Sequence, residues 1–361
     1  MARKRVTLSQ VAQEAGVAAS TASLVLAGRA DELRISTAAQ ERVRDAARRL
    51  GYRPNALSTG LRTGTTRTLG FVSDSVASSQ LAGEMIRGSI EAARARGYMV
   101  FVGETGGDAH LERDLLDAMF DRQVDGVVLA TMMTHARAIP AEATRMPTVL
   151  LNIEPTDHEA YVRVLPDEFE AGAAAARLLV DTGHRRIHLI GVGVDPAHAH
   201  PFGLAAAQRL RGVLSVLEDA GLEVASARRA VQWLPPEGFR LVTDLLASGA
   251  EVDAILCLND RLAMGAYQAL QERGVTVPDE VSVLSFDDTS FARWLRPGLT
   301  TFAFPQRALG RAATDELIDL IERGAAAPPP GPARLIPSPL RLRESVADRG
   351  SLSGGTAGGK R

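Results

Sequence analysis

The stretch from Val6 to Gly28, VTLSQVAQEAGVAASTASLVLAG, has the pattern of two short helices around a tight turn. In its first half, apolar residues recur at the i, i+3, i+4, i+7 spacing of one helix face, and Thr7 stands in the position of an N-cap. Gly16 ends this helix, because glycine adopts the left-handed conformation of a helix C-terminus without steric cost. The sequence therefore predicts a second helix from Ala19 to Leu26.

The second predicted helix has an outer face narrow enough to enter the major groove of DNA. Its inner face would carry Ala22 and Val25. The outer face consists of Ala19, Ser20, Ser23 and Leu24. On this spacing alone, a small helical hairpin without any ligand is an equally good interpretation.

A third helix would close a small core with the first two. It is predicted to begin at Ser36 or Thr37, and Gln40 stands in the capping-box position after Thr37. An apolar stripe follows along the helix, and Gly51 ends it.

The next segment, GYRPNALSTGLRTG, predicts a short hinge helix. Pro54 prevents the third helix from continuing, Asn55 caps a new one, and Leu61 lies near its end. Isolated helices shorter than about 12 to 15 residues are marginal in water. We therefore expect this helix to form only on DNA, where Leu61 could enter between base steps as wedge residues do.

These segments together resemble the DNA-binding headpiece and hinge of the lactose/galactose repressor (LacI) family of bacterial transcription regulators. The resemblance is carried, at fixed offsets, by TLSQVAQEAGV, STAS, VLAG, RIS and QERVRDAARRLGYRPNALSTGLRTG. It implies an all-α helix-turn-helix headpiece over 1–53 and a hinge helix and linker over 54–67. The residues that it assigns to double-stranded DNA are Thr7, Ala19, Ser20, Thr21, Ser23, Leu24, Arg29, Tyr52, Asn55, Leu57 and Leu61. One departure is Ala18, where the family usually carries a serine whose capping contributes about 1 kcal/mol.

Charge is distributed unevenly along the 361 residues, which are too many for one ordinary domain. Residues 1–68 hold twelve Arg or Lys against five Asp or Glu, a net charge of +7. Since the whole chain carries −2, the remainder carries −9. A basic head on an acidic body is typical of a protein whose head binds nucleic acid.

Cysteine content and hydropathy exclude several classes of protein. Cys257 is the single cysteine, so neither an intrachain disulfide nor a cysteine metal site is expected, and we predict no metal and no cofactor. The N-terminal MARKRVTLSQ has no apolar signal-peptide core, and no segment reaches the about 18 apolar residues of a membrane helix. We therefore expect a cytoplasmic protein that does not contact a membrane.

From Thr68 onward, short apolar strands alternate with amphipathic helices, which is typical of parallel βα units. The predicted strands are 69–73, 99–103, 126–130, 149–152, 187–191, 254–258 and 281–286. The predicted helices are 81–96, 111–122, 170–181, 204–220, 238–248, 261–273 and 307–323.

This body, 68–343, resembles the effector-binding and dimerisation core of the same family, which is similar to a two-lobed α/β periplasmic sugar-binding protein with parallel sheets and three crossovers. The resemblance places the N-terminal lobe at 69–165 with a return near 297–325, and the C-terminal lobe at 166–296 with the last strands to about 343. The tail 344–361 is rich in Gly and Ser and is predicted to be disordered. It has no leucine heptads, so we expect a homodimer without a coiled-coil tail.

Candidate effector ligands stand where the predicted strands end, the edge at which open α/β sheets bind small molecules. A sugar requires planar hydrogen-bonding groups and an aromatic face. The candidates are Asp74, Asn152, Arg209, Trp233, Asn259 and Asp287, of which Arg209 and Trp233 resemble effector residues of the family. For Asp74 and Asn152 a simple loop-capping role is the alternative, for Trp233 a core role, and Asp260, which follows Asn259, is as well explained as a helix cap.

The sequence thus predicts a repressor that binds a pseudo-palindromic operator and responds to a small molecule, expected to be a sugar. The alternatives are a sugar-binding protein without DNA function and a sugar-modifying enzyme. An enzyme is disfavoured because the run IGVGVDP lacks the third glycine of a dinucleotide fingerprint, and neither a Walker loop nor a nucleophile elbow is present.

Overall fold

The computed structural model describes residues 6–30, 34–52, 65–77, 83–156, 161–198, 203–324 and 331–350. The chain divides into two compact units, Met1–Arg67 and Thr68–Arg361. The described residues of the first unit form the helices α1 (Leu8–Ala15), α2 (Ala19–Leu26) and α3 (Thr37–Leu50). Their apolar faces meet in a core that includes Val11, Ala22, Val25, Val43 and Ala46. The predicted helices of the headpiece are therefore confirmed.

The helix caps of the first unit explain its boundaries. The amide of Gln10 donates to Thr7 Oγ1 at 3.4 Å and the amide of Thr7 donates to Gln10 Oε1 at 2.8 Å, so α1 begins with a capping box. It ends at Gly16, whose φ is 64°. Ala18 gives α2 no side-chain cap.

The predicted capping box between Thr37 and Gln40 is wrong. Ser36 caps α3 by accepting from the amide of Ala39, and the Gln40 side chain turns back to donate to Ile35 O at 3.0 Å. Gln40 is buried, so its amide satisfies a backbone carbonyl inside the domain instead of the helix end. The predicted hinge helix, with Asn55, Leu57 and Leu61, lies outside the described residues.

The second unit contains two six-stranded sheets. The N-lobe sheet has the order β11-β5-β4-β3-β1-β2 and its paired strands are all parallel. Its strands are β1 (Thr68–Ser73), β2 (Met99–Glu104), β3 (Gly126–Arg137), β4 (Thr148–Pro155), β5 (Val162–Pro166) and β11 (Arg334–Ile336).

The C-lobe sheet has the order β12-β10-β9-β8-β6-β7, in which only β12 pairs antiparallel. Its strands are β6 (Ile187–Gly191), β7 (Ser226–Arg229), β8 (Ala254–Cys257), β9 (Ser282–Asp287), β10 (Thr300–Ala303) and β12 (Leu340–Arg341). The fold is thus the expected α/β core of two parallel sheets.

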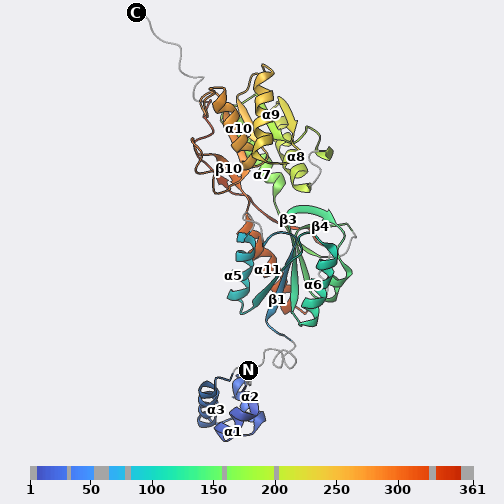
Figure 1. Cartoon of the computed structure of the whole chain (residues 1–361), viewed down its shortest axis with the longest axis vertical. Helices are drawn as coiled ribbons and strands as arrows, with labels where there is room; N and C mark the ends of the chain where they lie inside the picture. Colours follow the sequence, from blue (N-terminus) through green and yellow to red (C-terminus); the bar gives the residue numbers. More distant parts are fainter. Residues whose placement is uncertain are drawn as a thin grey trace, which may run out of the picture. The chain divides into compact units, whose positions relative to one another are not determined.

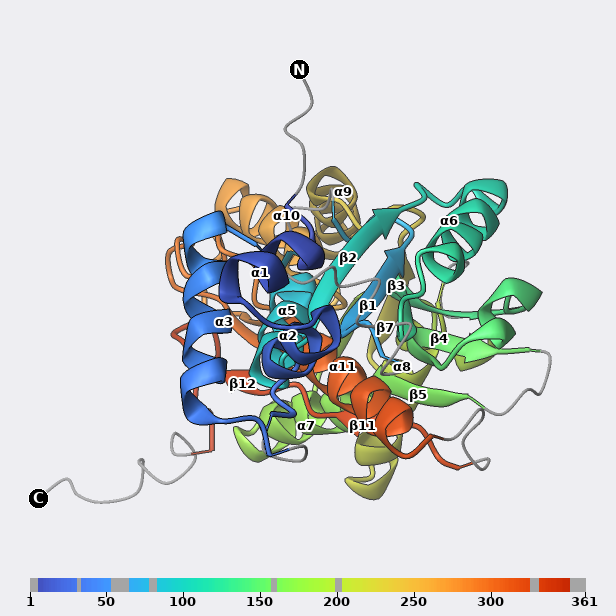
Figure 2. The ribbon, with the colours of Figure 1, turned by 90° about the horizontal axis from the view of Figure 1, so that it is seen from below.

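Each lobe has three layers, because strands buried on both faces need helices on both sides. In the N-lobe, α5 (Gly83–Ala95) and α11 (Gln306–Glu322) cover one face and α6 (Ala109–Asp121) the other (Figure 1). Figure 2 shows the same order from below, with β1 and β3 between α11 and α6. In the C-lobe, the two faces are covered by α7 (Glu168–Asp181) with α8 (Leu204–Asp219), and by α9 (Pro235–Ala247) with α10 (Asp260–Glu272).

The chain passes between the lobes three times, as expected, but at different residues. It crosses from β5 to α7, from β10 to α11, and from β11 to β12. The predicted return near 297–325 therefore starts too early, since β10 pairs with β9 and belongs to the C-lobe. The assignment of all last strands to the C-lobe is also wrong, because β11 pairs with β5. No helix among the described residues is both long and apolar enough to span a membrane.

The prediction of disorder from Glu344 is wrong for the first seven residues. Ser345 is fully buried and its hydroxyl donates to Val283 O at 2.6 Å, while Val283 N donates to Ser345 O at 2.8 Å. This segment therefore runs beside β9 and forms hydrogen bonds with the backbone of that strand. These hydrogen bonds order the segment although its composition is polar. Residues 351–361 lie outside the described part of the chain.

Two glycines allow α7 and α8 to cross in close contact. A Cβ on Gly212 would lie 2.0 Å from Phe169 O, and a Cβ on Gly172 would lie 1.9 Å from Arg209 O. We predict that Gly212→Ala lowers the free energy of unfolding by about 2 kcal/mol, because the helices must separate. Urea unfolding tests this, with Gly193→Ala, whose Cβ would meet nothing within 4 Å, as the control. Equal stability of the two variants would contradict the prediction.

Candidate functional site

The outer face of α2 is arranged as the sequence predicts. Ala22 and Val25 are buried against the headpiece core, whereas Ala19 and Ser20 are exposed. Thr21, Ser23 and Leu24 are half-buried at the edges of that face, and Arg29 is exposed after the helix. Thr7 is engaged in the cap of α1, and Tyr52 packs half-buried against the core. The exposed face of α2 thus carries small, uncharged side chains, suited to close approach to base edges.

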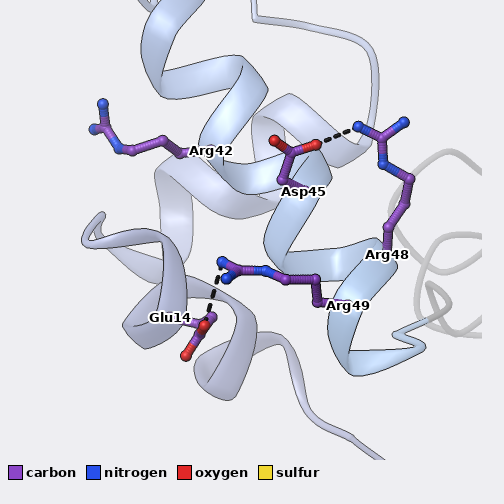
Figure 3. Close-up of a pocket in the computed structure, with 5 residues that line it drawn as sticks. All are labelled: Glu14, Arg42, Asp45, Arg48 and Arg49. Atoms are coloured by element: carbon purple, nitrogen blue, oxygen red, sulfur yellow. Dashed lines mark hydrogen bonds and ion pairs between the residues drawn. The ribbon is translucent and has the colours of Figure 1, made fainter.

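Arginines of α3 are engaged within the headpiece. Figure 3 shows Arg49 paired with Glu14 of α1 at 3.2 Å, and Arg48 paired with Asp45. Arg42 Nε donates to Ala15 O at 3.2 Å. Exposed ion pairs of this kind are worth little, roughly 0 to 1 kcal/mol each. Arg49 and Arg42 link α3 to α1, whereas the Arg48–Asp45 pair lies within α3, and the charge of these side chains still adds to the positive field of the headpiece.

A cleft of about 1480 Å³ lies in the second unit, bordered by residues of both lobes. Four of the six predicted effector residues line it, namely Arg209, Trp233, Asn259 and Asp287. They come from α8, the loop before α9, the end of β8 and the end of β9. The parallel topology brings them together, because the carboxyl ends of β8 and β9 meet at this edge of the sheet.

Arg209 is buried and held on three sides. Its Nε and Nη2 each lie 2.7 Å from Glu168 Oε2, and Nη1 donates to Leu258 O at 2.6 Å. Its Cζ lies 4.2 Å from the ring centroid of Phe286. Glu168 is equally buried, so the pair satisfies both charges inside the protein. The guanidinium is thereby fixed on the wall of the cleft.

Asp287 ends β9 with a φ of 110°, a conformation unusual for a residue with a side chain. Desolvation raises the pKa of its carboxyl to about 7; the nearby Asp260 also raises it, and the Arg209 guanidinium opposes the shift. Among the described residues its carboxyl makes no hydrogen bond, although it lines the cleft. It is therefore available to a ligand hydroxyl.

Trp233 and Asn259 are tied to each other and to the sheet. Trp233 Nε1 donates to Gly191 O at 3.0 Å, and Asn259 Nδ2 donates to Trp233 O at 3.2 Å. Asn259 Oδ1 accepts from the amide of Leu262 at 2.8 Å and caps α10. Asn259 thus fixes the backbone of Trp233, Gly191 holds its indole, and Trp233 lines the cleft.

Asp260 is structural, and its role differs from the helix cap considered above. It is fully buried, and its carboxylate accepts from Ser285, Thr301 and twice from Thr289. Burial raises the pKa of Asp260, and these four hydrogen bonds oppose that shift. They join β9, β10 and the loop that follows Asp287.

Asp74 and Asn152 are not among the described residues that line the cleft, so their role toward an effector stays a prediction. Asp74 Oδ1 accepts from the amides of Ser75 and of Met132, the latter at 3.0 Å, and ties β1 to the irregular part of β3. Asn152 is fully buried, with Nδ2 donating to Thr131 O at 2.9 Å. Both side chains satisfy strand-end backbone, which is the alternative role noted above.

Sequence reasoning missed several residues that line the cleft. These are, in particular, Met132, Met133, Glu168, Arg261, Phe304, Arg341 and Arg343. Only Arg261 carried a usable signal, because it directly follows the predicted strand-end pair Asn259 and Asp260. The structure describes no group of three His, Cys, Asp or Glu side chains that could hold a metal ion.

Both units of the chain match models of known protein families. Residues 7–55 match the model of bacterial regulatory proteins of the lacI family, and residues 176–346 match a periplasmic binding protein-like domain. The chain is 30% identical over 318 residues to the ribose operon repressor of Escherichia coli (strain K12), covering 87% of this chain and 93% of that protein. The chain belongs to the lacI family. It is accordingly a DNA-binding transcriptional regulator.

Solved structures show the same fold. The lac repressor dimer bound to operator and the anti-inducer ONPF has a TM-score of 0.75 and 24% identity, and the match covers 95% of this chain and all of that one. The regulator CelR in complex with cellobiose has a TM-score of 0.61 and 26% identity, covering 94% of this chain and 100% of that one. This chain thus has the same fold as these proteins along nearly its whole length.

The raised pKa of Asp287 predicts a pH-dependent stability. Between the ordinary carboxyl pKa and about 7, the folded protein retains a proton that the unfolded chain releases, so the free energy of unfolding falls as pH rises through this window. Asp287→Asn should remove this decline. Thermal denaturation at about pH 5 and about pH 8 measures it, with the exposed Asp244→Asn as control. A parallel decline in wild type and Asp287→Asn would contradict the prediction.

Proposed function

We propose that the chain is a repressor that binds a pseudo-palindromic operator as a homodimer and changes its operator affinity when a sugar binds between the lobes. The observation that carries this proposal is the cleft, in which Arg209, Asp287 and Trp233 converge. A fixed guanidinium, a carboxyl without a protein partner and an indole are the groups that a polyol needs. The complex of the similar regulator CelR with cellobiose supports a sugar. We further propose that the protein acts in the cytoplasm, because it must reach its operator there.

The proposed DNA interface is the outer face of α2 with its flanking residues. Ser20, Thr21 and Ser23 offer hydroxyls to base edges, and Ala19 permits close approach. Leu24 cannot form the bidentate hydrogen bonds of an arginine with guanine, so we assign it to a thymine methyl group. Thr7, Arg29 and Tyr52 are assigned to the DNA backbone, where contacts fix orientation. Asn55, Leu57 and Leu61 complete the proposed interface.

A second copy of the chain is the proposed partner of the N-lobe. β2 is the edge strand of its sheet, and it exposes Met99, Phe101 and Val102, with exposed fractions of 59%, 39% and 42%. Ile90 of α5 is also exposed, at 46%. Apolar side chains gathered on an unpaired strand edge mark a surface that is covered in the assembled protein.

The ion pair of the cleft links ligand binding to the movement of the lobes. Glu168 follows the crossover from β5 by a single residue, Asp167, and Arg209 holds it on the wall of the cleft. A ligand that binds Arg209 therefore also affects its partner Glu168, which lies at the crossover. We propose that the lobes close on the effector about this crossover, and that the hinges of the dimer separate as a result.

Operator binding is tested by a gel shift of the full-length protein on the DNA upstream of its own gene. We expect specific binding whose affinity falls steeply with salt, with a log-log slope of about −0.9 per neutralised phosphate. A panel of sugars added to the complex should include one that changes the affinity. Absence of specific binding, or a flat salt response, would favour a sugar-binding protein without DNA function.

The role of the ion pair is tested by removing one or both charges. Arg209→Met leaves the Glu168 carboxylate buried without its partner and should lower the free energy of unfolding by about 3 to 5 kcal/mol. Adding Glu168→Gln should restore much of that stability, but not the effector response, because the guanidinium is still missing. Urea unfolding and the gel shift with effector measure the two effects. An effector response that returns in the double variant would exclude Arg209 from the ligand site.

A further inference from the structure

The lining of the cleft is positively charged although the body of the chain is acidic. Its ionisable side chains are those of Arg209, Arg261, Arg293, Arg307, Arg341 and Arg343, against Glu84, Glu168, Asp287 and Asp288. The lining thus holds six cations and four acidic groups. Since the field of a concave surface is concentrated within it, this excess attracts anions.

Most of these charges are paired with one another. Asp288 accepts from Arg343 at 2.6 Å and lies 3.4 Å from Nε of Arg341. Arg209 pairs with Glu168, and Arg307 on the N-lobe side donates to Glu91, outside the cleft lining, at 2.9 Å and lies 3.9 Å from Glu84. Within the part of the chain that the structure describes, these pairs leave Arg261, Arg293 and Asp287 without an ion pair.

Arg261 is the most informative of the three. It is the second residue of α10, near the positive end of the helix dipole, where a cation is disfavoured. Its Nε is buried and makes no hydrogen bond. A buried donor without a partner costs about 1 to 3 kcal/mol. Both features are unfavourable for folding, and both are relieved when an anion binds the guanidinium.

The two walls of the cleft differ in character. Five of the six lining arginines belong to the C-lobe or to the segment that ends in it, whereas the N-lobe wall presents Met132 and Met133 beside Arg307 and Glu84. Met133 is 49% exposed. A ligand with one charged end and a less polar body would fit this division, with its charged end toward the C-lobe.

We propose that the effector is an anionic sugar, either a sugar phosphate or a sugar acid, and that Arg261 binds its anionic group. This inference rests on the proposed function of the cleft and narrows its ligand class. Asp287 would bind a hydroxyl group of the same ligand. Its raised pKa lets the carboxyl keep a proton beside an anion, which limits the repulsion between them.

Calorimetric titration of the full-length protein with matched sugars tests the inference. The probes are D-ribose, D-ribose 5-phosphate and D-ribonate, and D-glucose, D-glucose 6-phosphate and D-gluconate, which separate the phosphate from the carboxylate. We expect at least one charged probe to bind about tenfold or more tightly than its neutral counterpart. Arg261→Gln should abolish that difference. Arg211→Gln, which removes an exposed arginine of α8 outside the cleft lining, should preserve it.

A second variant is expected to change the phosphate affinity in the opposite direction, which a general loss of folding would not do. Above about pH 7, where the Asp287 carboxyl is ionised, Asp287→Asn removes a negative charge from the cleft and should strengthen the binding of inorganic phosphate, which Arg261→Gln should weaken. Equal binding of charged and neutral sugars, or equal affinities of wild type and Arg261→Gln for the charged probes, would overturn the inference. So would the absence of binding by every charged probe and by inorganic phosphate at millimolar concentration.

Failure of the inference is distinguishable from failure of the proposed function. If neutral sugars bind and change the gel shift, the regulator is sugar-responsive and only the anionic ligand class is wrong. If specific operator binding is missing, the proposed function itself fails, whichever sugar the cleft binds.

Discussion

The buried ion pair between Arg209 and Glu168 is the interaction on which the second unit depends most. It joins α8 to the start of α7, one residue after the chain has left the N-lobe. Two charges can be buried in this way only if each is fully hydrogen-bonded, and Leu258 O and the ring of Phe286 complete the surroundings of Arg209. Gly172 and Gly212 allow the two helices to approach closely enough for the pair to form.

A second buried carboxylate organises the rest of the cleft. Asp260 accepts four hydrogen bonds and thereby fixes β9, β10 and the loop after β9 against the start of α10. With this carboxylate satisfied by the protein, Asp287 is the neighbouring carboxyl that lines the cleft without a hydrogen bond to any described residue. Two neighbouring carboxyl groups therefore have different roles, set by the number of donors around each.

The headpiece depends on fewer and more local interactions. Its three helices are short, and their boundaries follow from a capping box at Thr7, a serine cap at Ser36 and left-handed glycines at Gly16 and Gly51. Local signals of this kind are visible in any sequence. That is why α1 and α2 were predicted to the residue, while the Thr37 capping box failed once Gln40 proved to be buried.

The sequence by itself determined the headpiece helices, the alternation of strands and helices in the body, and four residues of the cleft. The helices and the alternation are recorded in local periodicity, and Asn259 and Asp287 in their positions after predicted strands, whereas Arg209 and Trp233 were predicted from the resemblance to the family. Only the tertiary structure decided which lobe receives β10 and β11, that Ser345 is buried, that Asp74 and Asn152 serve the backbone, and that Arg261 faces the cleft. These outcomes depend on partners far away in the chain, and a side chain's role there is set by which donors and charges the fold places beside it.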